Sequence, residues 1–206
     1  MSINVVIDIS HFNGTVDFAQ VKAAGVVGVI QKATQGLTYT DPTYVSNRKA
    51  ATTAGLLWGA YHFATGDDAT AQAQYFLSVA QPDNNTLLVL DFEQNTSGTS
   101  MTLAGAETFV NYVNQQNGRY PGFYSGSYVK QLLGSNSDAT LAKCWFWLAQ
   151  YATTPQVPAN WPTWTMWQYT DGVNGPQPHT VAGVTGNCDR DQFNGSMDQL
   201  LKLWKK

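Results

Sequence analysis

Charged residues are scarce in this 206-residue chain, and glutamate is the scarcest of the four types. Asp, Glu, Lys and Arg together make up 12% of the residues, which is about half the usual share. Only two glutamates occur, Glu93 and Glu107. The polar surface must therefore consist mostly of Asn, Gln, Ser, Thr and Tyr. This composition weakly favours an extracellular or carbohydrate-facing protein.

Basic clusters and long apolar runs are missing as well. The net charge is −3, and lysines gather only at the C-terminus, from Lys202 to Lys206, so we expect no nucleic-acid partner. No apolar run approaches the ~18 residues that a membrane-spanning helix needs, so we expect no membrane partner. The N-terminus does not resemble a signal peptide, because Asp8 interrupts the early apolar run and Lys22 is the first basic residue.

Cysteine is equally rare, and metal-binding spacings are missing. Cys144 and Cys188 allow one disulfide at most, and we expect two buried free thiols instead. No His-x-x-x-His or similar pair supports a transition metal, and no loop carries a calcium-binding signature. The sequence therefore predicts neither a metal nor a cofactor.

The most informative segment that is present is an apolar strand that runs into two carboxylates, residues 86–93. Side chains alternate along a strand, so Asp91 and Glu93 point to one side and Phe92 to the other. A strand that simply ends and turns polar would give the same pattern. Whether this pair is an acid/base pair therefore depends on what the other strands place beside it.

Strands and helices alternate from the start of the chain. The apolar pattern predicts strands at residues 3–8, 26–32, 56–63, 86–93, 121–125, 144–150, 163–169 and 185–188. It predicts helices at residues 16–24, 41–54, 68–79, 102–116, 128–133 and 195–204. This order favours a barrel or a doubly wound sheet. The first turn, residues 8–14, has no G-x-G-x-x-G and no P-loop. We therefore expect an α/β fold in one domain, residues 1–206: a modified TIM-like barrel of five β/α units followed by three strands without full helices.

Carboxylates fall at the ends of three of these strands. Asp8 ends the first, Asp91 and Glu93 end the fourth, and Asp189 is expected to end the eighth. In parallel barrels such positions line the active site. Clustered carboxylates raise one another's pKa, so one of them can stay protonated and act as a general acid. Hydrolysis of a glycosidic bond needs one protonated and one ionised carboxyl group.

Several short motifs occur together in order along the chain. They are Asp8-Ile9-Ser10, Lys32-Ala33-Thr34-Gln35-Gly36, Gly59-Ala60-Tyr61-His62-Phe63, Asp91-Phe92-Glu93, and Trp167-Gln168-Tyr169 followed by Asp189. In these motifs the chain resembles glycoside hydrolase family 25, the Chalaropsis-type lysozymes, which include phage endolysins and bacterial and fungal muramidases. The resemblance implies the barrel described above. It also implies hydrolysis of the β-1,4 bond between N-acetylmuramic acid and N-acetylglucosamine in bacterial peptidoglycan.

The resemblance also implies residue roles. Glu93 matches the general acid and Asp91 the second acid of the D-x-E motif, and Asp8 and Asp189 match supporting acids. The expected substrate-contacting residues are Tyr61, Tyr124, Lys32, Gln35, Trp167 and Trp147. The strand pattern alone favours core packing over substrate contact for Trp147.

Two positions depart from the family pattern. A histidine beside the expected site, His62, is expected to have a structural role. Gln35 stands where relatives usually have glutamate, and Asp191 where they usually have asparagine. His62 follows Tyr61 and should therefore point away from the barrel interior.

Three readings of the function stay open at this point. A lysozyme is favoured, a non-enzymatic wall-binding module would not need a protonated glutamate, and a glycosidase could act on another amino-sugar polymer such as chitin. The sequence does not decide between retention and inversion. We expect a monomer that acts on the bacterial cell wall and reaches it through a holin-type pore, by non-classical export, or as a trimmed mature form.

Overall fold

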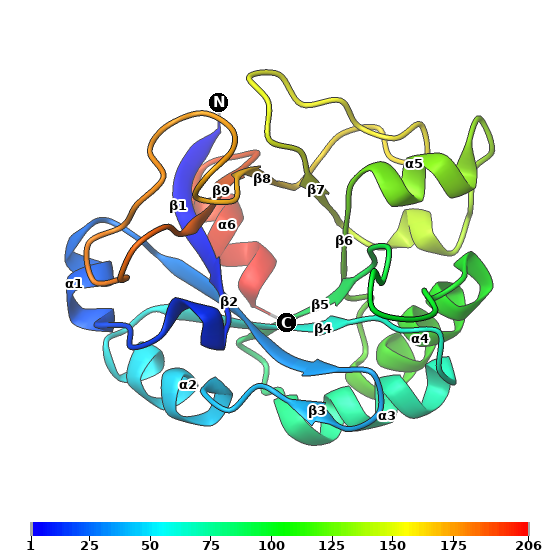
Figure 1. The fold of residues 1–206 in the computed structure, drawn as a ribbon, viewed down its shortest axis with the longest axis horizontal. Helices are drawn as coiled ribbons and strands as arrows, with labels where there is room; N and C mark the ends of the chain where they lie inside the picture. The colour runs from blue at the N-terminus through cyan, green and yellow to red at the C-terminus, as the bar shows by residue number, and fades with distance from the viewer. Residues whose placement is uncertain (1, 206) are drawn as a thin grey trace.

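Eight strands close a barrel in the computed structural model, which describes residues 2–205 (Figure 1). The order around the barrel is β1-β9-β8-β7-β6-β5-β4-β2, and pairing of β1 with β2 closes it. The strands are β1 (Ile3–Ile9), β2 (Gly28–Gln35), β4 (Leu57–Phe63), β5 (Thr86–Asp91), β6 (Gly122–Ser125), β7 (Phe146–Ala149), β8 (Met166–Thr170) and β9 (Asp189–Phe193). The short strand β3 (Tyr39–Thr40) forms a hairpin with the end of β2.

Helices follow each of the first five barrel strands, as the sequence predicts (Figure 1). They are α1 (Phe18–Ala23), α2 (Tyr44–Thr53), α3 (Ala69–Ala80), α4 (Leu103–Asn117) and α5 (Ser127–Leu133), and the one-turn 3₁₀ helices are η1 (His11–Asn13) and η2 (Leu141–Lys143). Residues 150–165 and 171–188 connect the last three strands without crossover helices. The predicted order of five β/α units and three further strands is therefore confirmed.

The prediction for the eighth strand was wrong in position and direction. Residues 185–188 lie outside the strands, and β9 begins at Asp189 and runs antiparallel to both β1 and β8. The reason is visible in the loop before it, where Gly183 and Gly186 adopt positive φ angles and the chain turns back to the open rim. The start of an antiparallel strand lies at the same rim as the ends of its parallel neighbours. Asp189 therefore still pairs with Asp8.

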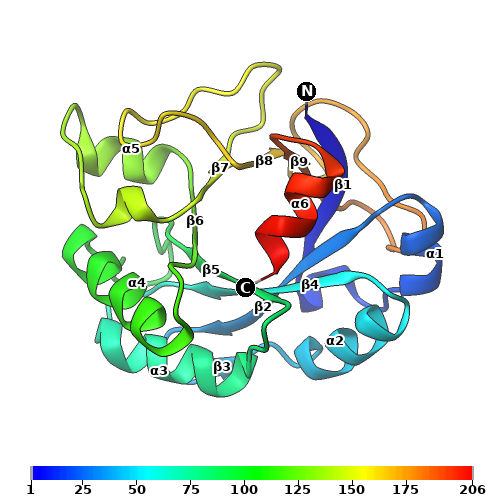
Figure 2. The ribbon, with the colours of Figure 1, turned by 180° about the vertical axis from the view of Figure 1, so that it is seen from behind.

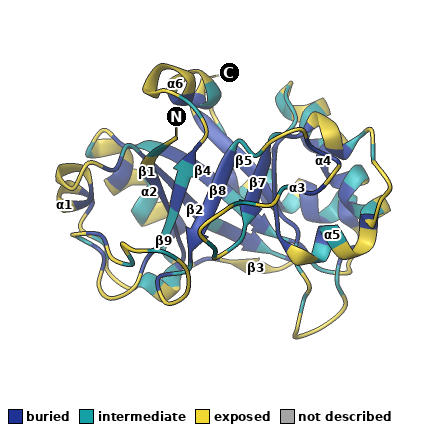
Figure 3. Ribbon diagram, turned by 90° about the horizontal axis from the view of Figure 1, so that it is seen from above, coloured by how far each residue is buried: buried dark blue, intermediate teal, exposed yellow. Residues whose placement is uncertain are grey.

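Two apolar layers lie on the two faces of the barrel wall. The outer layer, between strands and helices, includes Phe92, Phe123 and Trp167, whereas the inner layer includes Val89 and Met166. Because most strands bury both faces, they are almost continuously dark in the burial colouring (Figure 3).

Helix α6 (Met197–Trp204) closes one end of the barrel interior (Figure 2). Its Leu200 and Trp204 are buried in the inner layer, and Trp204 Nε1 donates a hydrogen bond to the Trp58 carbonyl oxygen at 2.8 Å. A Cβ atom at Gly28 would lie 2.8 Å from the Trp204 ring, so glycine is needed there for the indole to fit. With this end filled, the site must form at the opposite rim.

The predictions for His62 and the cysteines are confirmed. His62 is buried in the outer layer, hydrogen-bonds Thr34 and Gln72, and stacks on Phe109, and burial lowers its pKa to about 4. Both cysteines are buried and free. Within residues 2–205, no helix is long and apolar enough to cross a membrane.

Candidate active site

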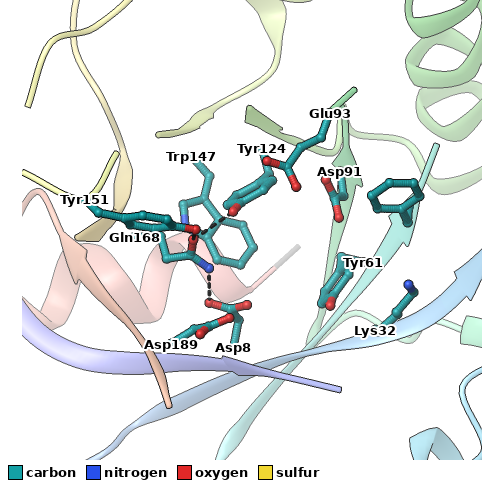
Figure 4. Close-up of a pocket in the computed structure, with 11 residues that line it drawn as sticks. Asp8, Lys32, Tyr61, Asp91, Glu93, Tyr124, Trp147, Tyr151, Gln168 and Asp189 are labelled. Carbon is teal, nitrogen blue, oxygen red and sulfur yellow. Dashed lines mark hydrogen bonds between the residues drawn. The ribbon is translucent and has the colours of Figure 1, made fainter. Parts of the chain in front are cut away.

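A cavity of about 230 Å³ opens at the rim opposite α6 (Figure 4). All four carboxylates that the sequence places at this rim line it. The lining residues are Asp8, Lys32, Tyr61, Phe63, Asp91, Glu93, Tyr124, Trp147, Tyr151, Gln168 and Asp189. The sequence thus predicted correctly that carboxylates from three strands converge at one point.

Asp91 and Glu93 point into the cavity from the end of β5 (Figure 4). Phe92 between them packs outward against Phe123. The backbone stays paired beyond the strand, because Phe92 N donates to the Tyr124 carbonyl oxygen at 2.9 Å. Ser125 Oγ donates to the Phe92 carbonyl oxygen at 2.6 Å. These bonds hold the two carboxyl groups on one side of the chain, as strand alternation requires.

Burial changes the protonation of this pair. It raises the pKa of Glu93. Burial, followed by the charge of Glu93, raises the pKa of Asp91 well above its ordinary value, and the charge of Lys32 opposes this shift. Two carboxyl groups in one poorly solvated cavity cannot both ionise easily. The pair therefore keeps a proton to a higher pH than an isolated carboxyl group would, as a general acid requires.

A second group of acids lies across the cavity on β1 and β9. Burial and the neighbouring charge of Asp8 raise the pKa of Asp189 to about 9. Burial and the charge of Asp191 raise the pKa of Asp8. Asp191 is fully buried below them and accepts a hydrogen bond from Trp147 Nε1 at 2.7 Å. This group therefore carries fewer than three negative charges at neutral pH.

The side-chain amide of Gln168 links Asp8 of this acid group to two tyrosines (Figure 4). Gln168 Nε2 donates to Asp8 Oδ2 at 2.7 Å, and Gln168 Oε1 accepts from the hydroxyls of Tyr124 at 2.7 Å and Tyr151 at 2.9 Å. Gln168 thereby fixes the direction of both hydroxyl groups. Tyr61 lies on the opposite wall, beside Lys32.

The sequence and the fold have counterparts in known proteins. The model of the family described as glycosyl hydrolases family 25 matches residues 7–177. The chain belongs to glycosyl hydrolase family 25. It is 36% identical to "Lysozyme M1" of Streptomyces globisporus, over 96% of this chain and 70% of that protein. It is 33% identical to the N,O-diacetylmuramidase of Chalaropsis sp., over 95% of this chain and 96% of the relative.

Solved structures agree with the family assignment. The bacterial lysozyme from Streptomyces coelicolor superposes with a TM-score of 0.87 at 36% identity, over 98% of this chain and 96% of that one. The family 25 barrel is therefore shared over nearly the whole chain.

Two predicted site residues of this family 25 chain, Trp167 and Gln35, are not among the residues that line the cavity. Trp167 packs in the outer layer, edge-on against Trp164 and Tyr169, and its Nε1 donates to the Gln150 carbonyl oxygen at 2.7 Å. Its neighbour Gln168 takes the inward position. Strand β8 is buried on both faces, so its sequence has no polar alternation to indicate which side faces inward.

Three other predicted contacts have clear positions, and their roles toward substrate stay predictions. Lys32 lines the cavity and donates through Nζ to Gln35 Oε1 at 2.6 Å, and Gln35 itself is not among the lining residues. Trp147 is 1% exposed and packs edge-on against Tyr124, so it forms the floor of the cavity.

Sequence reasoning missed Phe63, Tyr151 and Gln168 as lining residues. The inward position of Phe63 follows from alternation with Tyr61. Gln168 lies on a strand that is buried on both faces and Tyr151 lies in a loop, so neither has such a signal. Among residues 2–205, no group of three or more His, Cys, Asp and Glu side chains is arranged to hold a metal ion.

Proposed function

We propose that this chain is a lysozyme, an N-acetylmuramidase that hydrolyses the β-1,4 bond between N-acetylmuramic acid and N-acetylglucosamine in peptidoglycan. The observation that carries the proposal is the Asp91–Glu93 pair, whose raised pKa values keep a proton in an open cavity of a family 25 barrel. The names of the relatives, lysozyme and N,O-diacetylmuramidase, support the same substrate.

In the proposed mechanism, Glu93 protonates the glycosidic oxygen as the bond breaks. Asp91 stabilises the positive charge that develops on the sugar, either directly or by positioning the N-acetyl group of the substrate as an internal nucleophile. Asp8 and Asp189 form the facing wall. Asp8 accepts a hydrogen bond from Gln168, which fixes the hydroxyls of Tyr124 and Tyr151. These groups are then available to orient the sugar.

Replacement of the proposed acid tests this assignment. Glu93→Gln keeps the size of the side chain and removes its proton-donating carboxyl, so we expect kcat to fall by roughly 10²–10⁴-fold. Glu107→Gln is the matched control, because Glu107 is the only other glutamate and lies on α4. The readout is turbidity loss of a peptidoglycan suspension, with circular dichroism to verify folding. A folded Glu93→Gln protein with most of the wild-type rate would refute the role.

The setting in which the enzyme works is part of the same proposal. We propose that it acts on the bacterial cell wall as a monomer without nucleic-acid or membrane partners, and that it reaches the wall through a pore, by non-classical export or after trimming. The net charge of −3 and the lack of a basic cluster other than the C-terminal lysines support the absence of a nucleic-acid partner. Analytical ultracentrifugation of the pure protein tests the monomer, and a concentration-dependent dimer would contradict it.

A further inference from the structure

A large apolar side chain stands almost free in solvent beside the cavity. Phe12, in η1 directly after β1, exposes 85% of its surface, more than any other large hydrophobic residue among those described. The turn that carries it is well held, because Ser10 and Asn13 form reciprocal capping hydrogen bonds around it. A single exposed apolar residue is ordinary, whereas contiguous exposed apolar surface marks binding sites. The neighbours of Phe12 therefore decide its role.

Phe12 belongs to a row of three rings that the fold supports from below. Its ring centroid lies 4.0 Å from that of His11, and the His11 ring lies 6.0 Å from that of Tyr39. The buried carboxylate of Asp41 accepts from His11 N at 2.9 Å and lies 3.0 Å from His11 Nδ1. The Tyr39 hydroxyl lies 3.0 Å from the same nitrogen. These contacts fix the row in place rather than leaving it free to collapse onto the surface.

The row is continuous with the catalytic cavity. Lys32 Nζ lies 5.5 Å from the centre of the Tyr39 ring and 5.0 Å from that of Phe63. Lys32 and Phe63 both line the cavity. Lys32 therefore links Tyr39 to the cavity wall, and the row of rings continues from Tyr39 through His11 to Phe12.

A second hollow extends the site beyond Glu93. It has a volume of about 170 Å³ and lies between the segment after β5 and the start of α5. Its lining residues are Glu93, Gln94, Gly126, Ser127, Tyr128 and Gln131. The aromatic row comes from the segments after β1 and β2 instead. Binding surface thus lies on two sides of the acid pair, which is what a linear polymer crossing the mouth of the barrel requires.

We propose that Phe12, His11 and Tyr39 form a distal glycan subsite, where an N-acetylhexosamine ring outside the cleaved pair stacks on the aromatic row. The proposal rests on the lysozyme function above. Sugar rings present C–H faces that pack well on aromatic rings, whose own faces carry partial negative charge. Continuity with the cavity favours the substrate strand over a second protein copy as the occupant. The subsite would let the enzyme select long glycan strands over short fragments.

Chain-length dependence tests the subsite. The substrates are peptide-free glycan chains of increasing length prepared from peptidoglycan, and the readout is the ratio of kcat/KM on long chains to kcat/KM on the shortest chain that is cleaved. We expect Phe12→Ala to lower this ratio about fivefold. Val45→Ala is the matched control, because Val45 is another highly exposed apolar residue and lies on α2; it should leave the ratio unchanged.

Two substitutions of Tyr39 separate the contribution of its ring from that of its hydroxyl group. Tyr39→Phe keeps the ring and should keep the length dependence, whereas Tyr39→Ala should lower the ratio as Phe12→Ala does. An equal loss on short and long chains, or no loss on either, would overturn the proposal. So would a Phe12→Ala protein that changes its sedimentation coefficient but not its length dependence, because the ring would then serve contact between protein copies.

Failure of the subsite can be told apart from failure of the proposed function. If the wild-type protein cleaves no glycan of any length, the lysozyme proposal fails. The subsite is then decided by titration of uncleaved long glycan into ¹⁵N-labelled Glu93→Gln protein. Shifts of the amide signals of residues 11, 12 and 39 that are lost for short chains would support it, and unchanged signals would overturn it.

Discussion

Asp91 and Glu93 lie two positions apart on one chain segment, yet the charge of Lys32 affects the pKa of Asp91 and not that of Glu93. Burial and Glu93 raise the pKa of Asp91, and Lys32 lowers it, whereas the pKa of Glu93 is raised by burial. Lys32 therefore offsets part of the upward shift of Asp91, whose pKa stays raised, and so moves the pair toward ionised Asp91 beside protonated Glu93. The proposed mechanism uses this division of roles.

Removing the charge of Lys32 should move the acidic limb of the pH–rate profile. Without the cation the pKa of Asp91 rises further, so a higher pH is needed to ionise it. For Lys32→Met we expect the acidic limb of kcat/KM to shift upward by roughly one pH unit, and for Lys32→Arg, which keeps the charge, to stay near its wild-type position. An acidic limb that does not move in Lys32→Met would show that Asp91 does not titrate in this range.

The acids on the facing wall make stability depend on pH. The folded-state pKa values of Asp8, Asp189 and Asp191 are all raised, that of Asp189 to about 9, mainly by burial. A carboxyl group with a raised folded pKa contributes stability that is fully present below its unfolded pKa, near 4. That contribution is lost as the pH rises through the folded value.

Asp191→Asn should therefore stabilise the protein selectively at higher pH. Asparagine keeps an oxygen that can accept from Trp147 Nε1 and removes the ionisable group. We expect a gain of about 1–2 kcal/mol at pH 8 and little change at pH 4, measured by urea denaturation. Asp198→Asn, at an exposed position in the first turn of α6, is the control and should change the free energy of unfolding at pH 8 by less than Asp191→Asn does. A gain of equal size at both pH values would argue against a buried charge as the cause.

Helix α6 acts on the site indirectly, by filling the far end of the barrel. Trp204 is fully buried against Gly28 and bonded to the Trp58 carbonyl. Trp204→Ala should lower the free energy of unfolding by about 3–5 kcal/mol, because it leaves a large cavity. Chemical denaturation measures this. Lys202→Ala, on the exposed face of the same helix, should cost far less, and similar losses for both variants would mean that helix propensity rather than packing matters here.

The strand–helix alternation was predictable because most barrel strands are apolar on both faces and several helices have clear caps. Asp68 accepts from Ala71 N at the start of α3, and Gly118 ends α4 with a φ angle of 71°. Strand β9 was misplaced for the opposite reason. Its sequence from Asp189 to Phe193 is largely polar, and pairing with β1 and β8 rather than hydrophobicity makes it a strand.

The presence or absence of a clear sequence pattern also explains which parts of the site were predictable. Carboxylates at strand ends could be assigned to the rim because a barrel brings all such ends together. The side of β8 that faces inward could not be predicted, since both of its faces are buried. The sequence therefore predicted Trp167 as a site residue, although Gln168 is the residue that lines the cavity. Tyr151 reaches the cavity from the loop after β7, and its position depends on the folded path of that loop.

Taken as a whole, the barrel is closed at one end by α6 and open at the other, where the acid pair and the facing acids line the cavity (Figures 1 and 4). Lys32 links the aromatic row to this cavity. A site on an open rim with binding surface on two sides of the acid pair suits an enzyme that cleaves within a polymer. A closed pocket would instead favour a small substrate. This shape, the family and the acid pair all agree with cleavage of the peptidoglycan glycan strand.

The identity of the new reducing end tests the proposed function most directly. Purified peptidoglycan is digested with the wild-type protein, the products are reduced with borohydride, and the fragments are analysed by mass spectrometry. Cleavage after N-acetylmuramic acid predicts that the newly formed reduced ends are N-acetylmuramitol. Reduced N-acetylglucosamine at those ends would contradict the account.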